Sequence, residues 1–165
     1  MLATARCSYA TAGYREVCPD LISRTSDHQS VVAEARSAFQ FLERRGATIQ
    51  AEDRPDRTIL AYVENPLTYE VELDWREGAA FLLVAQTVNG DRPGGYYTDE
   101  GRRVRVHLLE ALRKAGVSSP ENERCLEAVT ALSGREAMIS QLTTLSSLLQ
   151  NELGALTENS KRIFG

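Results

Sequence analysis

The chain has 165 residues and a formal net charge of −4, with 42% hydrophobic and 25% charged residues. These values are typical of a single globular domain and exclude wholesale disorder. The small negative charge argues against a dedicated nucleic-acid-binding protein, which needs many basic side chains on one face to displace counterions from phosphates. No apolar run reaches the roughly 18 residues that a membrane-spanning helix requires, and the first residues lack the pattern of a secretory signal. The chain is therefore expected in the cytoplasm.

Residues 1–25 show no clear periodicity and are interpreted as an N-terminal arm, with a short helix expected around residues 14–17. The first clear element follows Ser26, which has Gln29 three residues later in the pattern of a capping box. Apolar residues then recur at helical spacing until Gly46, a residue that commonly ends helices. The sequence predicts a helix over residues 28–45, at the start of an α+β core that spans residues 26–116.

From Ala47 onward the apolar period changes from 3.6 to 2, which is typical of strands. Four strands are predicted, over residues 47–52, 57–63, 68–75 and 79–88. Short turns without crossover helices indicate an antiparallel meander rather than a parallel sheet. The fourth run is apolar on both alternations and is expected to be the most buried strand. The predicted core includes Leu73, Trp75, Phe81 and Leu83.

A glycine-rich connection over residues 89–101 leads into the predicted helices. One helix is expected over residues 102–115, ended by Gly116, and the next begins at Ser119, because Pro120 suits the first helical position. Ser133 and Gly134 should interrupt that helix before it continues over residues 135–153 with a stripe of leucines. The predicted fold class is thus α+β, with an antiparallel β-meander of about four strands packed with helices. Residues 117–165 form a helical C-terminal segment, interpreted as packing on the core, with self-association through the leucine stripe as the alternative.

Three carboxylates alternate with the apolar side chains of the third strand: Glu70, Glu72 and Asp74. Residues two apart on a strand lie about 7 Å from each other on one face. We interpret this face as solvated or facing a partner, and a row of like charges would attract a basic protein. A cation site is the alternative, but its ligands would have to converge from other elements as well.

The glycine-rich loop carries Tyr96 and Tyr97 side by side. Tyrosines on such a loop are common in protein interfaces, although a simple connector with a tyrosine packed beneath it is also consistent with the pattern. Fingerprints of phosphate-binding and dinucleotide-binding loops are absent.

Basic side chains crowd the start of the helix predicted after the loop, where the helix dipole disfavours positive charge. They are Arg102, Arg103 and Arg105, followed by His107. This misplacement indicates an acidic neighbour, for which the face of Glu70, Glu72 and Asp74 is the leading candidate, or an anionic partner.

No catalytic constellation stands out. His107 is the better placed of two histidines, but the sequence identifies no nucleophile or carboxylate beside it. Cys7, Cys18 and Cys125 cannot all pair within one chain and have no metal-ligand spacing, so reduced thiols are expected. The sequence predicts no metal site and no cofactor.

The order of predicted elements resembles that of small bacterial α+β proteins, many of which are immunity proteins of polymorphic toxin systems. The resemblance covers about residues 28–115 and is carried by Phe-Leu-x-x-x-Gly over residues 41–46 and by Tyr-x-Val-x-Leu-Asp-Trp-Arg-Glu-Gly over residues 69–78. It implies a non-enzymatic cytoplasmic protein that occludes the active site of a toxin.

These observations favour a protein-binding module, a monomer or homodimer without nucleic-acid or membrane partners. Its partner is expected to be another protein, such as a basic toxin domain. The expected contact residues are Glu70, Glu72, Asp74, Tyr96, Tyr97, Arg102 and Arg103. Two alternatives stay open. One is a small-molecule binder or enzyme that uses the loop over residues 89–101 and the basic segment after it, and the other is an adaptor that oligomerises through its C-terminal helices.

Overall fold

The computed structural model describes the backbone of residues 19–165 and the side chains of residues 26–165. The first helix, α1 (Pro19–Arg44), begins well before the predicted capping box at Ser26, so residues 19–25 belong to a helix and not to an arm. Pro19 explains the earlier start, because proline lacks an N–H and is preorganised for the first turn of a helix. The short helix expected over residues 14–17 lies outside the described residues.

The chain then forms the predicted antiparallel meander. The strands are β1 (Thr48–Asp53), β2 (Arg57–Val63), β3 (Leu67–Asp74) and β4 (Ala79–Gln86), and they pair in sequence order. A fifth strand, β7 (Arg105–His107), pairs antiparallel with β4 at the edge of the sheet. The α+β fold class predicted from the sequence is therefore confirmed, with one strand more than expected.

The segment before β7 corrects the predicted helix over residues 102–115. Residues Thr98–Asp99 (β5) and Arg102–Arg103 (β6) pair as a small separate hairpin, and the helix α2 begins only at Leu108 and ends at Ala115. Val104 and Val106 alternate with basic residues in this segment, which is a strand pattern. The basic residues that seemed misplaced at a helix start therefore precede the helix.

Three further helices complete the chain: α3 (Pro120–Thr130), α4 (Arg135–Glu158) and α5 (Ser160–Phe164). The predicted start of α3 is confirmed, because the Ser119 side chain accepts a hydrogen bond of 3.1 Å from the backbone N–H of Asn122. The predicted break is confirmed as well, since α4 begins directly after Gly134. None of the helices that the structure describes combines the length and the apolarity that a membrane-spanning segment needs.

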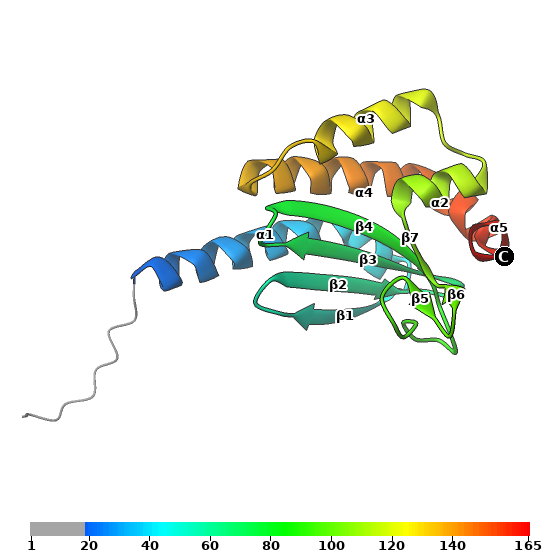
Figure 1. Cartoon of the computed structure of the whole chain (residues 1–165), viewed down its shortest axis with the longest axis horizontal. Coiled ribbons are helices and arrows are strands. Elements are labelled where there is room, and N and C mark those ends of the chain that lie inside the picture. Colours follow the sequence, from blue (N-terminus) through cyan, green and yellow to red (C-terminus); the bar gives the residue numbers. More distant parts are fainter. Residues whose placement is uncertain (1–18) are drawn as a thin grey trace, which may run out of the picture.

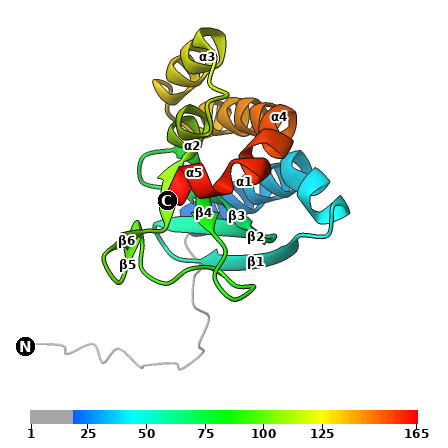
Figure 2. The same cartoon turned by 90° about the vertical axis from the view of Figure 1, so that its right-hand side faces the viewer.

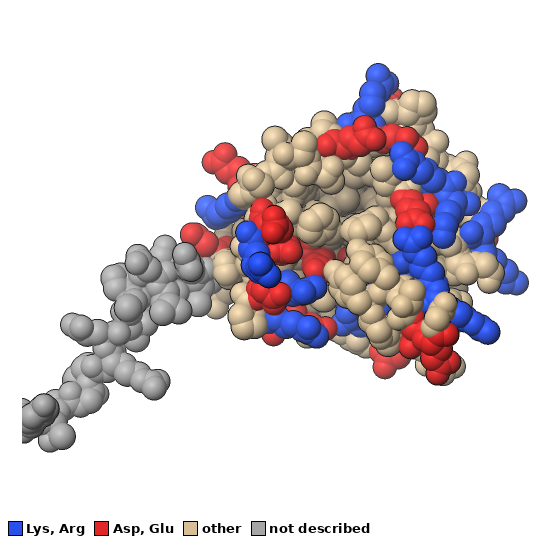
Figure 3. Space-filling model, viewed as in Figure 1, with Lys and Arg blue, Asp and Glu red and all other residues tan. Residues whose placement is uncertain are grey.

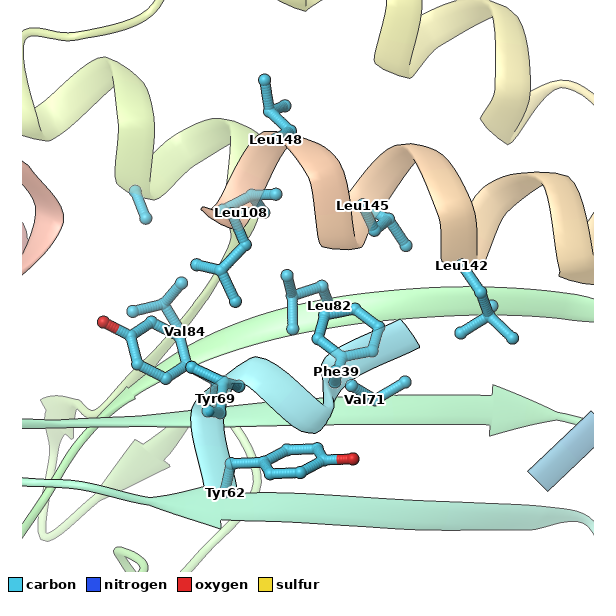
Figure 4. Close-up of a cluster of buried hydrophobic side chains, with 14 of the residues drawn as sticks. Phe39, Tyr62, Tyr69, Val71, Leu82, Val84, Leu108, Leu142, Leu145 and Leu148 are labelled. Carbon is cyan, nitrogen blue, oxygen red and sulfur yellow. The ribbon is translucent and has the colours of Figure 1, made fainter. Parts of the chain in front are cut away.

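The helices gather on one face of the sheet. Figures 1 and 2 show α1 and α4 side by side against that face, whereas the β5–β6 hairpin lies on the opposite side of the molecule. The register places Val71 of β3 opposite Leu60 and Leu82, and Tyr69 opposite Tyr62 and Val84. These side chains form a continuous core with Phe39 of α1 and with the leucine stripe of α4 (Figure 4). The stripe is thus buried in the core of its own chain.

The predicted core was correct for Leu73 and Leu83, which are both buried, and overestimated the burial of Trp75 and Phe81. Leu83 is buried on the opposite face of the sheet, outside the main core, and Trp75 and Phe81 are only partly buried. The most buried strand is β3 and not β4, because both faces of β3 are covered. What covers its acidic face defines the candidate site.

Candidate functional site

The acidic face of β3 is not solvated. Glu70 is 1% exposed and Glu72 is 4% exposed, which contradicts the predicted open row of carboxylates. The physical reason is that the glycine-rich segment between β4 and β7 folds back over this face and brings basic side chains to it. Asp74, the third of the row, remains partly exposed and accepts hydrogen bonds of 2.9 Å from the backbone N–H groups of Arg76 and Glu77, so it organises the β3–β4 turn.

Glu70 lies between two guanidinium groups. Arg105 donates to both of its carboxylate oxygens, at 2.6 Å from Nε and 3.0 Å from Nη2. Arg92, from the loop, donates to Glu70 Oε1 at 2.9 Å and also pairs with Glu52. The acidic neighbour expected for the basic segment is thus confirmed for Arg105.

Arg105 also binds the loop itself through its backbone. Its Nη2 donates to the carbonyl oxygen of Pro93 at 2.8 Å, and its Nη1 lies within 3.1 Å of three further carbonyl oxygens. Those three belong to Gly94, Gly95 and Tyr96. One guanidinium group thereby joins Glu70 of the sheet to four consecutive residues of the loop. We call this arrangement of Arg105, Glu70 and residues 93–96 the arginine clamp.

The clamp requires a specific loop geometry. Gly95 has a φ of +63°, and a Cβ atom at this position would collide with the carbonyl oxygen of Thr98. Only glycine meets both conditions without strain. Burying two charges costs several kcal/mol per ion unless they are paired and hydrogen-bonded, and here nearly every donor of Arg105 has an acceptor. The polar network therefore fixes one conformation of the loop.

The two tyrosines extend this network to the surface. The hydroxyl of Tyr96 donates to Glu72 Oε2 at 2.8 Å, and Arg57 donates to the other oxygen of Glu72 at 3.0 Å. The guanidinium carbon of Arg57 lies 5.7 Å from the centroid of the Tyr96 ring, within the range of a cation–π contact. Burial and the Glu72 carboxylate raise the pKa of Tyr96 above its ordinary range. Tyr96 nevertheless keeps 45% of its surface exposed.

His107 pairs with the second tyrosine. Its Nε2 lies 2.8 Å from the hydroxyl of Tyr97, and the Tyr97 ring meets that of Tyr96 edge-on at 4.7 Å. Burial lowers the pKa of His107, against the opposing effect of the Glu110 carboxylate. Burial raises the pKa of Tyr97. Both groups are thus held in their neutral forms near pH 7, as a hydrogen-bonded aromatic cluster that also includes Phe81.

Arg102 and Arg103 lie in β6, at the outer end of the loop, and both are exposed. Arg103 makes a two-pronged ion pair with Glu110 of α2, with both N–O distances at 2.7 Å. Neither residue joins the clamp. Seven contact residues were predicted from the sequence. Of these, the loop brings Tyr96 into contact with Glu72, whereas Arg102 and Arg103 lie in the β5–β6 hairpin beside the loop.

The sequence-based interpretation missed two residues that organise this site, Arg92 and Arg57. The signal for both was present in the charges, because two carboxylates on a strand that is otherwise apolar need cationic partners once both of its faces are covered. Figure 3 views this side of the molecule and shows uncharged side chains across much of its middle, with acidic and basic side chains gathered to either side. The described residues contain no group of three or more His, Cys, Asp or Glu side chains that could hold a metal ion, and Cys125 is an exposed free thiol.

Comparison with known proteins adds no functional assignment. No protein-family model, no curated protein and no solved structure matches the chain.

Proposed function

We propose that the chain is a non-enzymatic protein-binding module that contacts its partner through the clamped loop, with Tyr96 and Tyr97 as the central contacts and Arg102 and Arg103 beside them. The observation that supports this most is a half-exposed tyrosine on a loop whose backbone is held by a buried arginine. A loop fixed before binding loses little conformational entropy in the complex, and tyrosines supply large contact area from few rotatable bonds.

The proposal differs from the sequence-based one in its electrostatics. Glu70 and Glu72 are covered and paired with arginines, so they offer no negative surface to a basic partner. The affinity is instead expected to come from the aromatic area of the loop, with the exposed arginines favouring a partner that has acidic groups at the rim of its contact surface. Occlusion of a toxin, which the resemblance to immunity proteins implies, is one form that such binding takes.

The test is kinetic. The full chain serves as bait for a partner, which is then immobilised for surface plasmon resonance with wild-type protein and with Tyr96→Ala and Tyr97→Ala. Each substitution should weaken binding by about 1–2 kcal/mol or more, chiefly through faster dissociation. Leu132→Ala is the matched control, because Leu132 is an exposed apolar residue, 52% accessible, that follows α3 and does not belong to the loop.

A further variant separates the ring from the hydroxyl. Tyr96→Phe retains the aromatic area but loses the hydrogen bond to Glu72, so it should bind better than Tyr96→Ala if the ring makes the contact. Wild-type kinetics in both alanine variants, with unchanged melting temperatures, would place the interface elsewhere. Turnover of a small molecule that His107→Gln abolishes would favour the enzyme alternative.

A further inference from the structure

A cleft of about 700 Å³ lies on the helix-covered side of the sheet, between α1 and the β1–β2 hairpin. Its volume falls within the range of roughly 300–1,000 Å³ that small-molecule sites occupy. Val32 of α1 and Leu60 of β2 contribute apolar surface, and the small side chains of Ala33 and Ala51 leave the space between helix and hairpin open. The cleft is on the opposite side of the sheet from the clamped loop.

One wall of the cleft is a fixed aromatic pair. The ring of His28 stacks on Trp75 with a centroid distance of 4.0 Å and an interplanar angle of 8°. The indole N–H of Trp75 donates to Thr58 Oγ1 at 3.1 Å, and this hydroxyl donates to Asp53 Oδ1 at 2.6 Å. The chain of hydrogen bonds holds the indole in one orientation, so this wall of the cleft need not be ordered when a ligand binds.

The charged side chains around the cleft differ in whether they are paired. Arg54 pairs with Glu52, and Asp53 is engaged by Thr58. Arg36 is exposed at the cleft and makes no hydrogen bond or ion pair with any side chain that the structure describes. An exposed guanidinium group whose N–H donors are not engaged by such a side chain can form two parallel hydrogen bonds to a carboxylate, phosphate or sulfonate. Asp53 disfavours a second anionic group near the hairpin turn.

A buried donor lies close to the same region. Tyr62 is fully buried and its hydroxyl has no hydrogen-bond partner among the described residues. Its ring points along β2, away from the C-terminal end of that strand (Figure 4). Burial and, to a lesser extent, the Glu43 carboxylate raise the pKa of Tyr62 above its ordinary range, and the Arg36 guanidinium opposes this effect.

We propose that this cleft binds a flat aromatic small molecule that carries a single anionic group. The ring lies against the Trp75–His28 wall and the apolar side chains of Val32 and Leu60, and the anionic group binds Arg36. Such a molecule satisfies the apolar, aromatic and cationic parts of the cleft together. The site is independent of the clamped loop, so a ligand here acts in addition to protein binding.

The probe for this proposal is 8-anilinonaphthalene-1-sulfonate, which combines fused aromatic rings with one sulfonate. Trp75 is the only tryptophan of the chain, so its emission reports directly on this cleft. Titration of the full-length folded protein should show one-to-one binding that quenches Trp75. Arg36→Gln should weaken this binding about tenfold, since it removes a charge-assisted contact. N-phenyl-1-naphthylamine, which lacks the sulfonate, should bind more weakly and be indifferent to Arg36→Gln.

Two variants control the result. Arg44→Gln removes a second exposed arginine of α1, one that donates a hydrogen bond to Gln40 and does not line the cleft, and should leave the affinity unchanged. Ala51→Phe narrows the cleft and should abolish binding while thermal melting stays close to wild type. Equal affinities in Arg36→Gln and Arg44→Gln, or probe binding that leaves Trp75 emission unchanged, would overturn the proposal.

Discussion

The two faces of the sheet are built from the same strands but are stabilised in different ways. The face beneath α1 and α4 is apolar, and its side chains come from β2, β3, β4 and β7 and from the helices α1 to α5. The opposite face buries Glu70, Glu72 and Arg105 beneath a loop. Apolar packing is non-directional and accepts many arrangements, whereas buried charges need particular partners at particular distances. The helix-covered face therefore contributes most to the stability of the compact fold, and the loop-covered face selects one conformation of a surface loop.

The largest expected effect is on the helix-covered face. Phe39 is fully buried between α1 and the sheet, so Phe39→Ala should lower the free energy of unfolding by about 3–5 kcal/mol through lost transfer energy and a residual cavity. Phe81→Ala, on the loop-covered face, should cost clearly less, because Phe81 is already partly exposed. Urea denaturation measures both values. Equal losses would show that the two faces contribute alike.

The second effect concerns the clamp. Arg105→Met should cost about 3 kcal/mol, the lower end of what breaking a buried ion pair costs, because Arg92 still neutralises Glu70. Glu70→Leu combined with Arg105→Met should recover part of that loss, since both charges of the buried pair are then removed together and Arg92 keeps Glu52 as its partner. Denaturation of the two single variants and the double variant forms a double-mutant cycle. Strictly additive losses would mean that the two side chains do not act as a pair.

The smallest effect is a pH dependence on the loop-covered face. The pKa of His107 is lowered in the folded protein, so between that value and the ordinary value of about 6.5 the unfolded chain binds more protons. Stability should therefore fall as the pH drops through about 6.5, and be fully present above it. Melting temperatures of wild type and His107→Gln, compared from about pH 7.5 to pH 5, isolate this contribution because all other titrating groups are shared. Parallel curves for the two proteins would contradict the expectation.

The sequence was sufficient for the fold where one physical signal dominated. The strand boundaries of β2 were predicted correctly, because alternation and turn residues agree there, and Ser119 with Pro120 located the start of α3. The prediction failed at residues 102–107, where three arginines obscured the alternation of Val104 and Val106. The electrostatic misfit of these arginines with a helix start was itself evidence for a strand.

The candidate site was predictable in its members but not in its arrangement. The carboxylates of β3 and the tyrosines of the loop were predicted as two separate contact surfaces. The prediction that the basic segment has an acidic neighbour was correct for Arg105. A period-2 pattern indicates which side chains share a face, but it does not say whether that face is covered. Burial of Glu70 depends on contacts across 35 positions of the chain, and local sequence patterns carry no information about them.

The arginine clamp has a consequence for how the surface of the protein can diversify. Arg105 binds the loop through main-chain carbonyl oxygens, and at position 96 it donates to the backbone carbonyl and not to the side chain. Exchange of the side chain at that position removes its hydrogen bond to Glu72 but leaves the main-chain contacts that hold the loop. The loop backbone is held by Arg105, and the exposed side chain is not part of that contact. Substitution at one or two positions of the loop could therefore change the binding specificity without a change of fold.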